Sequence, residues 1–347
     1  MPNRINIISI GGGWVVNNRH IPALQQSGLF DIVGVVSKNP DHAQATARKH
    51  GIPNSALAVD FSGGWQAKAE AVMIGTWPET HYEIAKAALL AGKHVLTEKP
   101  MTVKQEHAVE LAAMARERKL TLALVHNLQF GRAAQSLRRD LASGRLGPIR
   151  AVYGVQVSNH ARKIPAWCHA LPLGLFYDEA PHFYYLFRWL AGDMELLQST
   201  VWKDGRHDHT PRIVSAEYRA AKGFPVFLHV NFDSSITEWH ITVIAEKGVA
   251  HLDMWRDIYH FLPNDGVHGA KDIFMKSIRM TTQHLRGVWA NGLLYVRGGY
   301  LCGNNEVVSR FHRAIRGEDC LQGMNAEEGQ RVTGMMHEVI AKARYFE

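Results

Sequence analysis

Three residues at the end of a short apolar run could act together on a charged or reacting group. In "HVLTEKPMTV" (residues 94–103), Glu98, Lys99 and Pro100 directly follow residues that predict a buried strand. Proline fixes its own φ and restricts the residue before it, so Lys99 would be held at a set angle, with a cis bond as one way to do so. A solvated strand end is the plainer interpretation, and the preceding elements must decide between the two.

Those elements begin with a βαβ unit that contains a glycine-rich turn. A strand, "INIISI" (5–10), is followed by "GGGWVVNNRHIPAL" and then by a second strand within "DIVGVVSKN". Gly11 and Gly13 occupy the first two positions of G-x-G-x-x-G, where a tight turn lets a pyrophosphate approach the backbone at a helix N-terminus. Val16 stands at the third position and would push helix and strand slightly apart. We expect a dinucleotide to contact the turn, including Trp14 and Val15; a glycine turn without a ligand is the alternative.

The pattern continues as an alternation that predicts a parallel sheet. "AVMIG" is a strand, "THYEIAKAALLAG" a helix and "HVLTE" a strand, and a further helix and strand reach about residue 127. Ligands of open α/β sheets lie at the carboxyl ends of the strands, so Lys99 is expected to face a cofactor crevice. Six further residues at these strand ends are predicted cofactor contacts: Thr76, Trp77, Pro78, His81, Glu98 and Asn127.

The end of the second strand bears on the choice of cofactor. NAD-binding proteins place an Asp or Glu there to bind the ribose 2′-hydroxyl, whereas this chain has Ser37 and Lys38. A hydroxyl and an ammonium group suit a 2′-phosphate, which a carboxylate would repel. The sequence therefore favours NADP, with NAD possible; an ordinary turn is the alternative for these two residues.

Length and composition limit the class of protein. The 347 residues favour two domains, predicted as 1–127 and 128–347, and 46% hydrophobic with 20% charged residues is typical of globular proteins. Three widely spaced cysteines argue against disulfides and CxxC metal sites, which favours a reducing, cytoplasmic location. The net charge of +7 is scattered, so we expect no nucleic-acid partner, and no run of about 18 apolar residues predicts a membrane span. The opening segment is interpreted as a first strand rather than a signal peptide.

The order and spacing of four segments resemble those of a known family. "GGGWVVNNRHIPAL", "GTWPETH", "AGKHVLTEKP" and "VHNLQF" are similar to the glucose-fructose oxidoreductase/inositol dehydrogenase (Gfo/Idh/MocA) family of NAD(P)-dependent oxidoreductases. The resemblance implies an α/β protein. A doubly wound parallel Rossmann sheet would precede an α/β domain with a large, mostly antiparallel open sheet. The open sheet would bind substrate and form a homo-oligomer, a dimer or tetramer.

The same resemblance implies the catalytic residues. The lysine of Glu-Lys-Pro would lie beside the nicotinamide and the reacting oxygen, which is Lys99 here. "GLFYDEAPHFYYLFRWLAG" supplies Asp178 and His182, four residues apart and so on one helix face. His182 would exchange the substrate's hydroxyl proton, Lys99 would stabilise alkoxide charge, and Asp178 would hold the hydroxyl or orient the histidine. A buried core histidine is the alternative for His182, and Tyr184, Tyr185 and Trp189 are expected in the core or an interface.

The expected substrate is a sugar, a sugar derivative or a cyclitol. In "VSNHARKIPAW" (157–167), Asn159, Arg162 and Lys163 suit hydroxyls or a phosphate, with a solvated loop as the alternative. An imine or enone reductase and a non-catalytic NADP-binding regulator are the competing functions. No carboxylate or cysteine joins histidines such as His207 and His209 at ligand spacing, so no metal is assigned. Residues 262–292 are interpreted as an insertion, a lid or dimer arm with helical parts.

Overall fold

The computed structural model describes residues 4–204, 209–266, 269–299 and 301–347, which form two compact units. The first unit contains Met1–Asn127 and Gly303–Met335, and the second contains Leu128–Cys302 and Met336–Glu347. The predicted division differs in one respect, because it placed all of 128–347 in the second domain.

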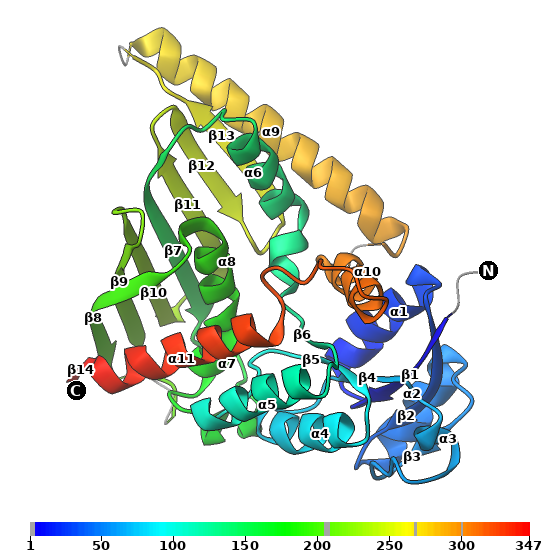
Figure 1. The fold of residues 1–347 in the computed structure, drawn as a ribbon. Helices are drawn as coiled ribbons and strands as arrows, with labels where there is room; N and C mark the ends of the chain where they lie inside the picture. Colours follow the sequence, from blue (N-terminus) through cyan, green and yellow to red (C-terminus); the bar gives the residue numbers. More distant parts are fainter. Residues whose placement is uncertain (1–3, 205–208, 267–268, 300) are drawn as a thin grey trace. The chain divides into compact units, whose positions relative to one another are not determined.

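The first unit is built on a parallel sheet of six strands (Figure 1). The strand order is β3-β2-β1-β4-β5-β6, and every neighbouring pair is parallel. This is the Rossmann order, and its direction reverses between β1 and β4, where such sheets bind dinucleotides. The strands are β1 Ile5–Ile10, β2 Phe30–Val36, β3 Ser55–Ala56, β4 Ala71–Ile74, β5 His94–Thr97 and β6 Leu122–Leu124.

Helices connect these strands and begin where the sequence supplies helix-starting residues. Asn39 caps α2 by accepting from the N–H groups of Asp41 and His42, and prolines open α2 and α4. The helices are α1 Ile21–Ser27, preceded by a π-helical segment Val16–His20, α2 Pro40–His50, α3 Gly64–Ala67, α4 Pro78–Leu90 and α5 Gln105–Glu117.

The C-terminal part of the chain returns to this unit. α10 (Asn304–Ile315) packs on α1, and the ring of Phe311 stacks on Phe30 with 6.1 Å between centroids. The backbone N–H of Leu124 in β6 donates to the carbonyl of Met324 at 2.8 Å. α11 (Ala326–Lys342) follows, with its first ten residues in this unit. Residues 303–335 therefore extend the core of the first unit.

The second unit contains a mixed sheet of eight strands in the order β13-β12-β11-β7-β10-β9-β8-β14. Five neighbouring pairs are antiparallel, and two, β10 with β7 and β14 with β8, are parallel. The predicted fold class is confirmed. The strands are β7 Ile149–Asn159, β8 Met194–Trp202, β9 Ile213–Ala220, β10 Pro225–Ser234, β11 Glu238–Ala245, β12 Gly248–Asp253, β13 Ile258–Pro263 and β14 Arg344–Phe346.

One face of this sheet forms the core of the second unit. Residues alternate between buried and exposed along β7, as expected when one face is covered. Gly154 on β7 lets α8 approach closely, since a Cβ there would lie 2.4 Å from the ring of Phe187. Figure 1 shows α8 across the sheet and α9 along β13. The helical segments are η2 Asn127–Phe130, α6 Arg132–Ala142, η3 Ala166–Ala170, α7 Leu175–Glu179, α8 Pro181–Ala191 and α9 Ala270–Val296.

Candidate active site

The glycine turn after β1 is shaped for a close backbone approach. Gly11 has φ +114°, and a Cβ there would lie 2.5 Å from the carbonyl oxygen of Gly75, so only glycine fits. A Cβ on Gly13 would meet nothing within 4 Å, which leaves the outer side of the turn open. Buried Val16 is accommodated by Gly75 after β4, where a Cβ would lie 2.5 Å from Val16 Cγ2. The neighbouring strand end thus makes room for the side chain expected to separate helix and strand.

Asn17 fixes this turn, a role that was not predicted from the sequence. Its side-chain amide donates to the carbonyls of Gly12 and Gly13 at 3.0 and 3.1 Å, and to Thr46 Oγ1 at 3.0 Å. Asn18 likewise donates to the carbonyl of Trp14 at 2.7 Å. With these carbonyls held by side chains, the turn keeps one shape. The predicted contacts Trp14 and Val15 are both exposed at the start of the helical segment.

The end of β2 offers a hydroxyl and an ammonium group. Ser37 is half-buried, its backbone N–H donates to Ala56, and its Oγ accepts from Asn39 N at 3.4 Å. Lys38 is exposed. The nearest carboxylate along the chain, Asp41, lies in the first turn of α2. The role of Ser37 and Lys38 as ligands of a 2′-phosphate stays a prediction.

His81 links the loops that follow β4 and β5. It is fully buried, with Nδ1 2.9 Å from the carbonyl oxygen of Pro100 and Nε2 3.2 Å from that of Thr76. Burial lowers its pKa below the ordinary histidine value. His81 therefore holds both loops in place through one carbonyl of each. The other predicted contacts here are Thr76, whose Oγ1 lies 2.7 Å from Thr80 Oγ1, exposed Trp77 and buried Pro78.

Glu98 and Lys99 leave β5 beside the end of β4. The backbone N–H of Glu98 donates to the Ile74 carbonyl at 2.9 Å, and the Lys99–Pro100 peptide bond is cis. The Glu98 carboxylate lies 2.8 Å from Nε2 of buried His20 and accepts from the Lys99 backbone N–H at 3.0 Å. Burial opposes its ionisation, but the His20 hydrogen bond and nearby positive charge hold the pKa of Glu98 below its usual range. Glu98 thus anchors the segment that carries Lys99.

The end of β6 carries a third buried histidine. His126 Nδ1 lies 2.8 Å from the carbonyl oxygen of Gly323, and burial lowers the pKa of His126 to about 4. The next residue, the predicted contact Asn127, is half-buried at the start of η2. The first unit therefore brings the ends of β1, β4, β5 and β6 to one edge of its sheet.

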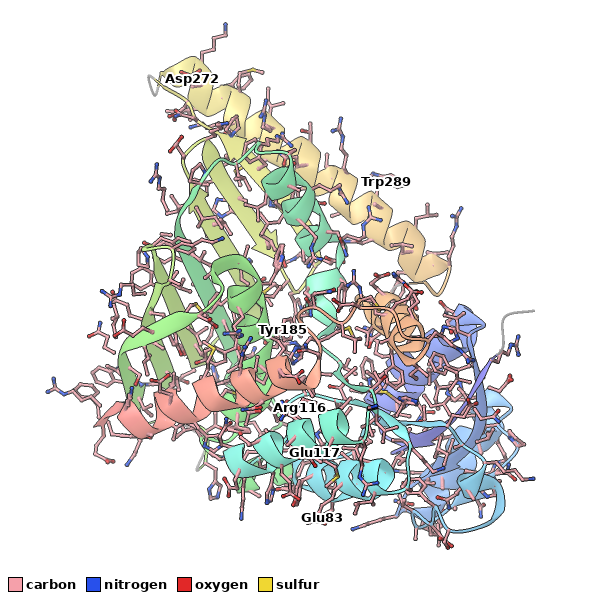
Figure 2. The ribbon with its side chains drawn as sticks, in the orientation of Figure 1. Glu83, Arg116, Glu117, Tyr185, Asp272 and Trp289 are labelled. Carbon is pink, nitrogen blue, oxygen red and sulfur yellow. The ribbon has the colours of Figure 1, made fainter. Side chains whose placement is uncertain are left out.

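In the second unit, Asp178 and His182 lie on consecutive helices. Ala180 joins α7 and α8 with helical dihedral angles, so the four-residue spacing keeps both side chains on one side. His182 Nδ1 lies 2.8 Å from Tyr185 Oη, and the backbone N–H of Leu128 donates to the same oxygen at 3.0 Å. Tyr185 is fully buried on α8 (Figure 2). The predicted core tyrosine therefore also orients the predicted catalytic histidine.

Aromatic rings and polar groups lie around His182 in this unit. The indole of Trp239 lies 5.5 Å from the imidazole between ring centroids, and Trp255 lies 5.7 Å beyond it. Trp239 is buried, and its Nε1 has no hydrogen-bond partner within the described part of the chain. His182 itself is half-buried. An imidazole that is partly exposed and oriented by a phenol can exchange protons with a bound molecule.

The predicted substrate residues divide into three environments. Asn159 holds its own turn, donating to the Ser235 carbonyl at 2.7 Å and accepting from Ala161 N at 2.8 Å. Arg162 is paired with buried Glu179 at 2.6 Å, and Lys163 is exposed. Glu179, which sequence analysis did not single out, also accepts from Gln156 on β7. Of the three, Arg162 belongs to a fixed polar cluster of Arg162, Glu179 and Gln156.

Neither a metal site nor a membrane-spanning helix is found within the described residues. No group of three or more His, Cys, Asp or Glu could hold a metal ion among residues 4–204, 209–266, 269–299 and 301–347. The rings of His169 and His209 lie 4.8 Å apart, whereas His207 lies outside the described residues. None of the described helices is long and apolar enough to cross a membrane.

Family models match both units. A model described as "Oxidoreductase family, NAD-binding Rossmann fold" matches residues 5–126, and one described as "GFO/IDH/MocA C-terminal domain" matches residues 134–251. The chain belongs to the Gfo/Idh/MocA family. The first unit is therefore an NAD-binding Rossmann domain of an oxidoreductase family, as predicted, while the choice between NAD and NADP is not decided by the match.

Gfo/Idh/MocA proteins of known name resemble parts of this chain. The 1,5-anhydro-D-fructose reductase of Ensifer adhaerens is 34% identical over 41% of this chain and 42% of its own length. The UDP-N-acetylglucosamine 3-dehydrogenase of Acidithiobacillus ferrooxidans is 33% identical over 37% of this chain and 42% of its own. The chain thus spans about two fifths of the length of these curated relatives.

Solved structures of the family share the fold over nearly the whole chain. The WlbA dehydrogenase from Bordetella pertussis, in complex with NADH and UDP-GlcNAcA, has a TM-score of 0.77 at 19% identity and covers 99% of this chain and 96% of its own. An NAD binding oxidoreductase from Klebsiella pneumoniae has a TM-score of 0.78 at 19% identity over 98% and 96%. At such identities the likeness establishes the architecture alone.

Proposed function

We propose that the protein is an NAD(P)-dependent oxidoreductase that transfers a hydride between nicotinamide and a carbinol or ketone carbon of a sugar, a sugar derivative or a cyclitol. The observation that carries this proposal is the Glu98–Lys99–Pro100 segment, anchored through His20 at the cofactor edge of a Rossmann sheet. Named relatives act on sugar-type molecules, which supports the substrate class.

The residues of the first unit fit a dinucleotide. Gly11 adopts a conformation that only glycine tolerates well, Gly13 leaves the turn open, and Asn17 holds the turn in shape. These residues would hold the pyrophosphate, while Ser37 and Lys38 would bind the adenosine ribose and favour its 2′-phosphate form. When bound, the nicotinamide supplies the hydride donor or acceptor.

The chain's own residues would manage the proton and the charge. His182, held through Nδ1 by Tyr185, would remove the hydroxyl proton during oxidation and return it during reduction. Tyr185 can hydrogen-bond to both protonation states of His182, because a hydroxyl accepts from a protonated Nδ1 and donates to an unprotonated one. The Lys99 ammonium group would stabilise negative charge on the substrate oxygen, and Asp178 would hold the hydroxyl or orient the imidazole.

Two substitutions test the assignment. Lys99→Ala and His182→Ala should keep folding and NADPH binding, measured by circular dichroism and fluorescence titration. Turnover on a panel of sugars and cyclitols should fall about 10²–10⁴-fold, since each variant loses a group that acts on the reacting oxygen. Lys68→Ala and His169→Ala are matched controls at exposed positions and should retain the wild-type rate.

Near-normal turnover in either variant would remove that residue from the mechanism. A wild-type protein that binds NADPH tightly but oxidises or reduces no sugar or cyclitol would contradict the proposed substrate class. Cofactor binding without turnover on any alcohol, ketone, imine or enone would contradict enzymatic function altogether.

A further inference from the structure

The long helix α9 exposes an unusually apolar surface. It runs for 27 residues, which corresponds to about 40 Å, and none of its residues is buried. Eleven of its large apolar side chains are between 38% and 83% exposed: Ile273, Phe274, Met275, Ile278, Met280, Leu285, Val288, Trp289, Leu293, Tyr295 and Val296. A helix that is apolar over most of its circumference is normally buried.

Among the described residues, α9 contacts the rest of its own unit along one side. Gln283 bonds the backbone of Phe261 in β13, and Asn291 donates to the carbonyls of Arg256 and Asp257. A Cβ on Gly287 would lie 2.9 Å from Ile258, so the helix packs tightly there. These contacts fix the rotation of α9 and determine which side chains face outward.

The outward residues form one continuous stripe. Phe274, Leu285 and Val296 are separated by eleven residues, as are Ile278 and Trp289. An eleven-residue repeat corresponds to about 3.67 residues per turn, so these positions stay aligned along the helix. Figure 2 shows Trp289 on the side of α9 turned away from the sheet. We name these five residues the outer stripe; they are between 42% and 83% exposed.

The exposed area of α9 suits a specific protein interface. The eleven side chains together present on the order of 1,000 Å² of apolar surface. The largest apolar patch on a typical monomer is about 300–600 Å². The five residues of the outer stripe supply about half of the apolar area on α9, so two copies that met along this stripe would bury roughly 1,000 Å², the size at which a specific interface begins.

The charges on α9 favour a protein partner over a lipid surface. Arg279 and Arg286 lie on one flank of the outer stripe, whereas the other flank carries Val288 and Tyr295. A helix that lies on a membrane has a strongly polar face toward water, which α9 lacks because its opposite side packs on β13. An apolar centre with a basic rim on one side is the arrangement of a protein interface.

We propose that α9 is the assembly arm of this protein and that its outer stripe packs against α9 of a second copy. An apolar stripe is self-complementary, as a two-fold interface requires, and the one-sided arginines remain at its rim. The family model for the second unit ends at residue 251, before α9 begins. The arm is therefore an interface in addition to any that the open sheet face forms.

The test compares charge substitutions at matched exposed positions. The Leu285→Lys/Trp289→Lys double variant and wild type are measured by sedimentation velocity and light scattering. Protein concentrations run from about 0.1 to about 50 µM, which brackets roughly micromolar dissociation constants. Wild type should be dimeric or larger, and the double variant should dissociate at least a hundredfold more readily. Leu57→Lys in the first unit, where the leucine is also about half exposed, is the control and should assemble like wild type.

A second measurement avoids dependence on charge substitutions. In a Cys302→Ser background, whose remaining cysteines Cys168 and Cys320 are buried, Leu285→Cys should form a crosslinked dimer with a short bismaleimide and Leu57→Cys should not. A monomeric wild type, a double variant that assembles to the same size and with the same affinity as wild type, or an uncrosslinked Leu285→Cys protein would overturn the proposal. So would binding of wild type to anionic vesicles that the double variant abolishes.

Discussion

His126 should make the first unit sensitive to acid in a defined pH window. Its imidazole is buried at the end of β6, where Nδ1 contacts the Gly323 carbonyl, and burial lowers the pKa of His126 from 6.5 to about 4. The folded protein therefore binds fewer protons than the unfolded chain between these values. The stability contributed by a neutral His126 is complete above about pH 6.5 and is lost as the pH falls toward 4.

The magnitude follows from the two pKa values. Linkage gives a loss of about 2 kcal/mol in unfolding free energy between pH 7 and pH 5 from this one group. For a unit of this size that corresponds to a decrease in Tm of about 4–8 °C. Other buried histidines, such as His81, add to the same trend. The effect of His126 is therefore measured as a difference between variants.

The assay is thermal unfolding of wild type, His126→Gln and His169→Gln at pH 7, 6 and 5. Gln can donate to the Gly323 carbonyl but does not titrate, so His126→Gln should lose about 2 kcal/mol less than wild type over this range. His169→Gln, which removes an exposed imidazole, should follow wild type. Parallel losses in wild type and His126→Gln would refute the assignment of this acid sensitivity to His126.

Two further substitutions probe the sites directly. Tyr185→Phe removes the oxygen that contacts His182 and Leu128, so turnover should fall about tenfold or more and the acid limb of the pH–rate profile should move. The control Tyr184→Phe, whose phenol contacts Tyr218 instead, should leave that limb in place. Ser37→Asp should weaken NADPH binding about tenfold relative to NADH in fluorescence titrations, because a carboxylate repels the 2′-phosphate; an unchanged ratio would argue against this position as the phosphate site.

The fold could be predicted where local patterns determine the element. β-branched runs followed by glycine turns and amphipathic helices fix an alternating parallel sheet, and the strand ends then locate the cofactor edge. The return of residues 303–335 to the first unit could not be predicted in this way. α10 carries an ordinary amphipathic pattern, and contacts such as the stacking of Phe311 on Phe30 show which core receives it.

The positioning roles of three residues were missed for a related reason. Asn17, Glu179 and Tyr185 act through hydrogen bonds to groups that the backbone brings near them, and side-chain type alone does not reveal such partners. The spacing of Tyr185 three residues after His182 was a usable signal, since such residues are neighbours on a helix. Asn17 also had one, because a polar amide one helical turn after a glycine turn can bond the turn's carbonyls.

Burial distinguishes the structural histidines from His182, a distinction that sequence patterns could not make. Three histidines are nearly or fully buried. His20 contacts the Glu98 carboxylate, His81 the Pro100 carbonyl, and His126 at the end of β6 the Gly323 carbonyl. Proton exchange with a bound molecule requires access, which these rings lack. His182 is half-buried and oriented by a phenol, so it combines access with a fixed geometry. If the three buried rings keep Lys99 in place, their substitution should change cofactor or substrate affinity together with rate. Loss of His182 should then reduce the rate alone.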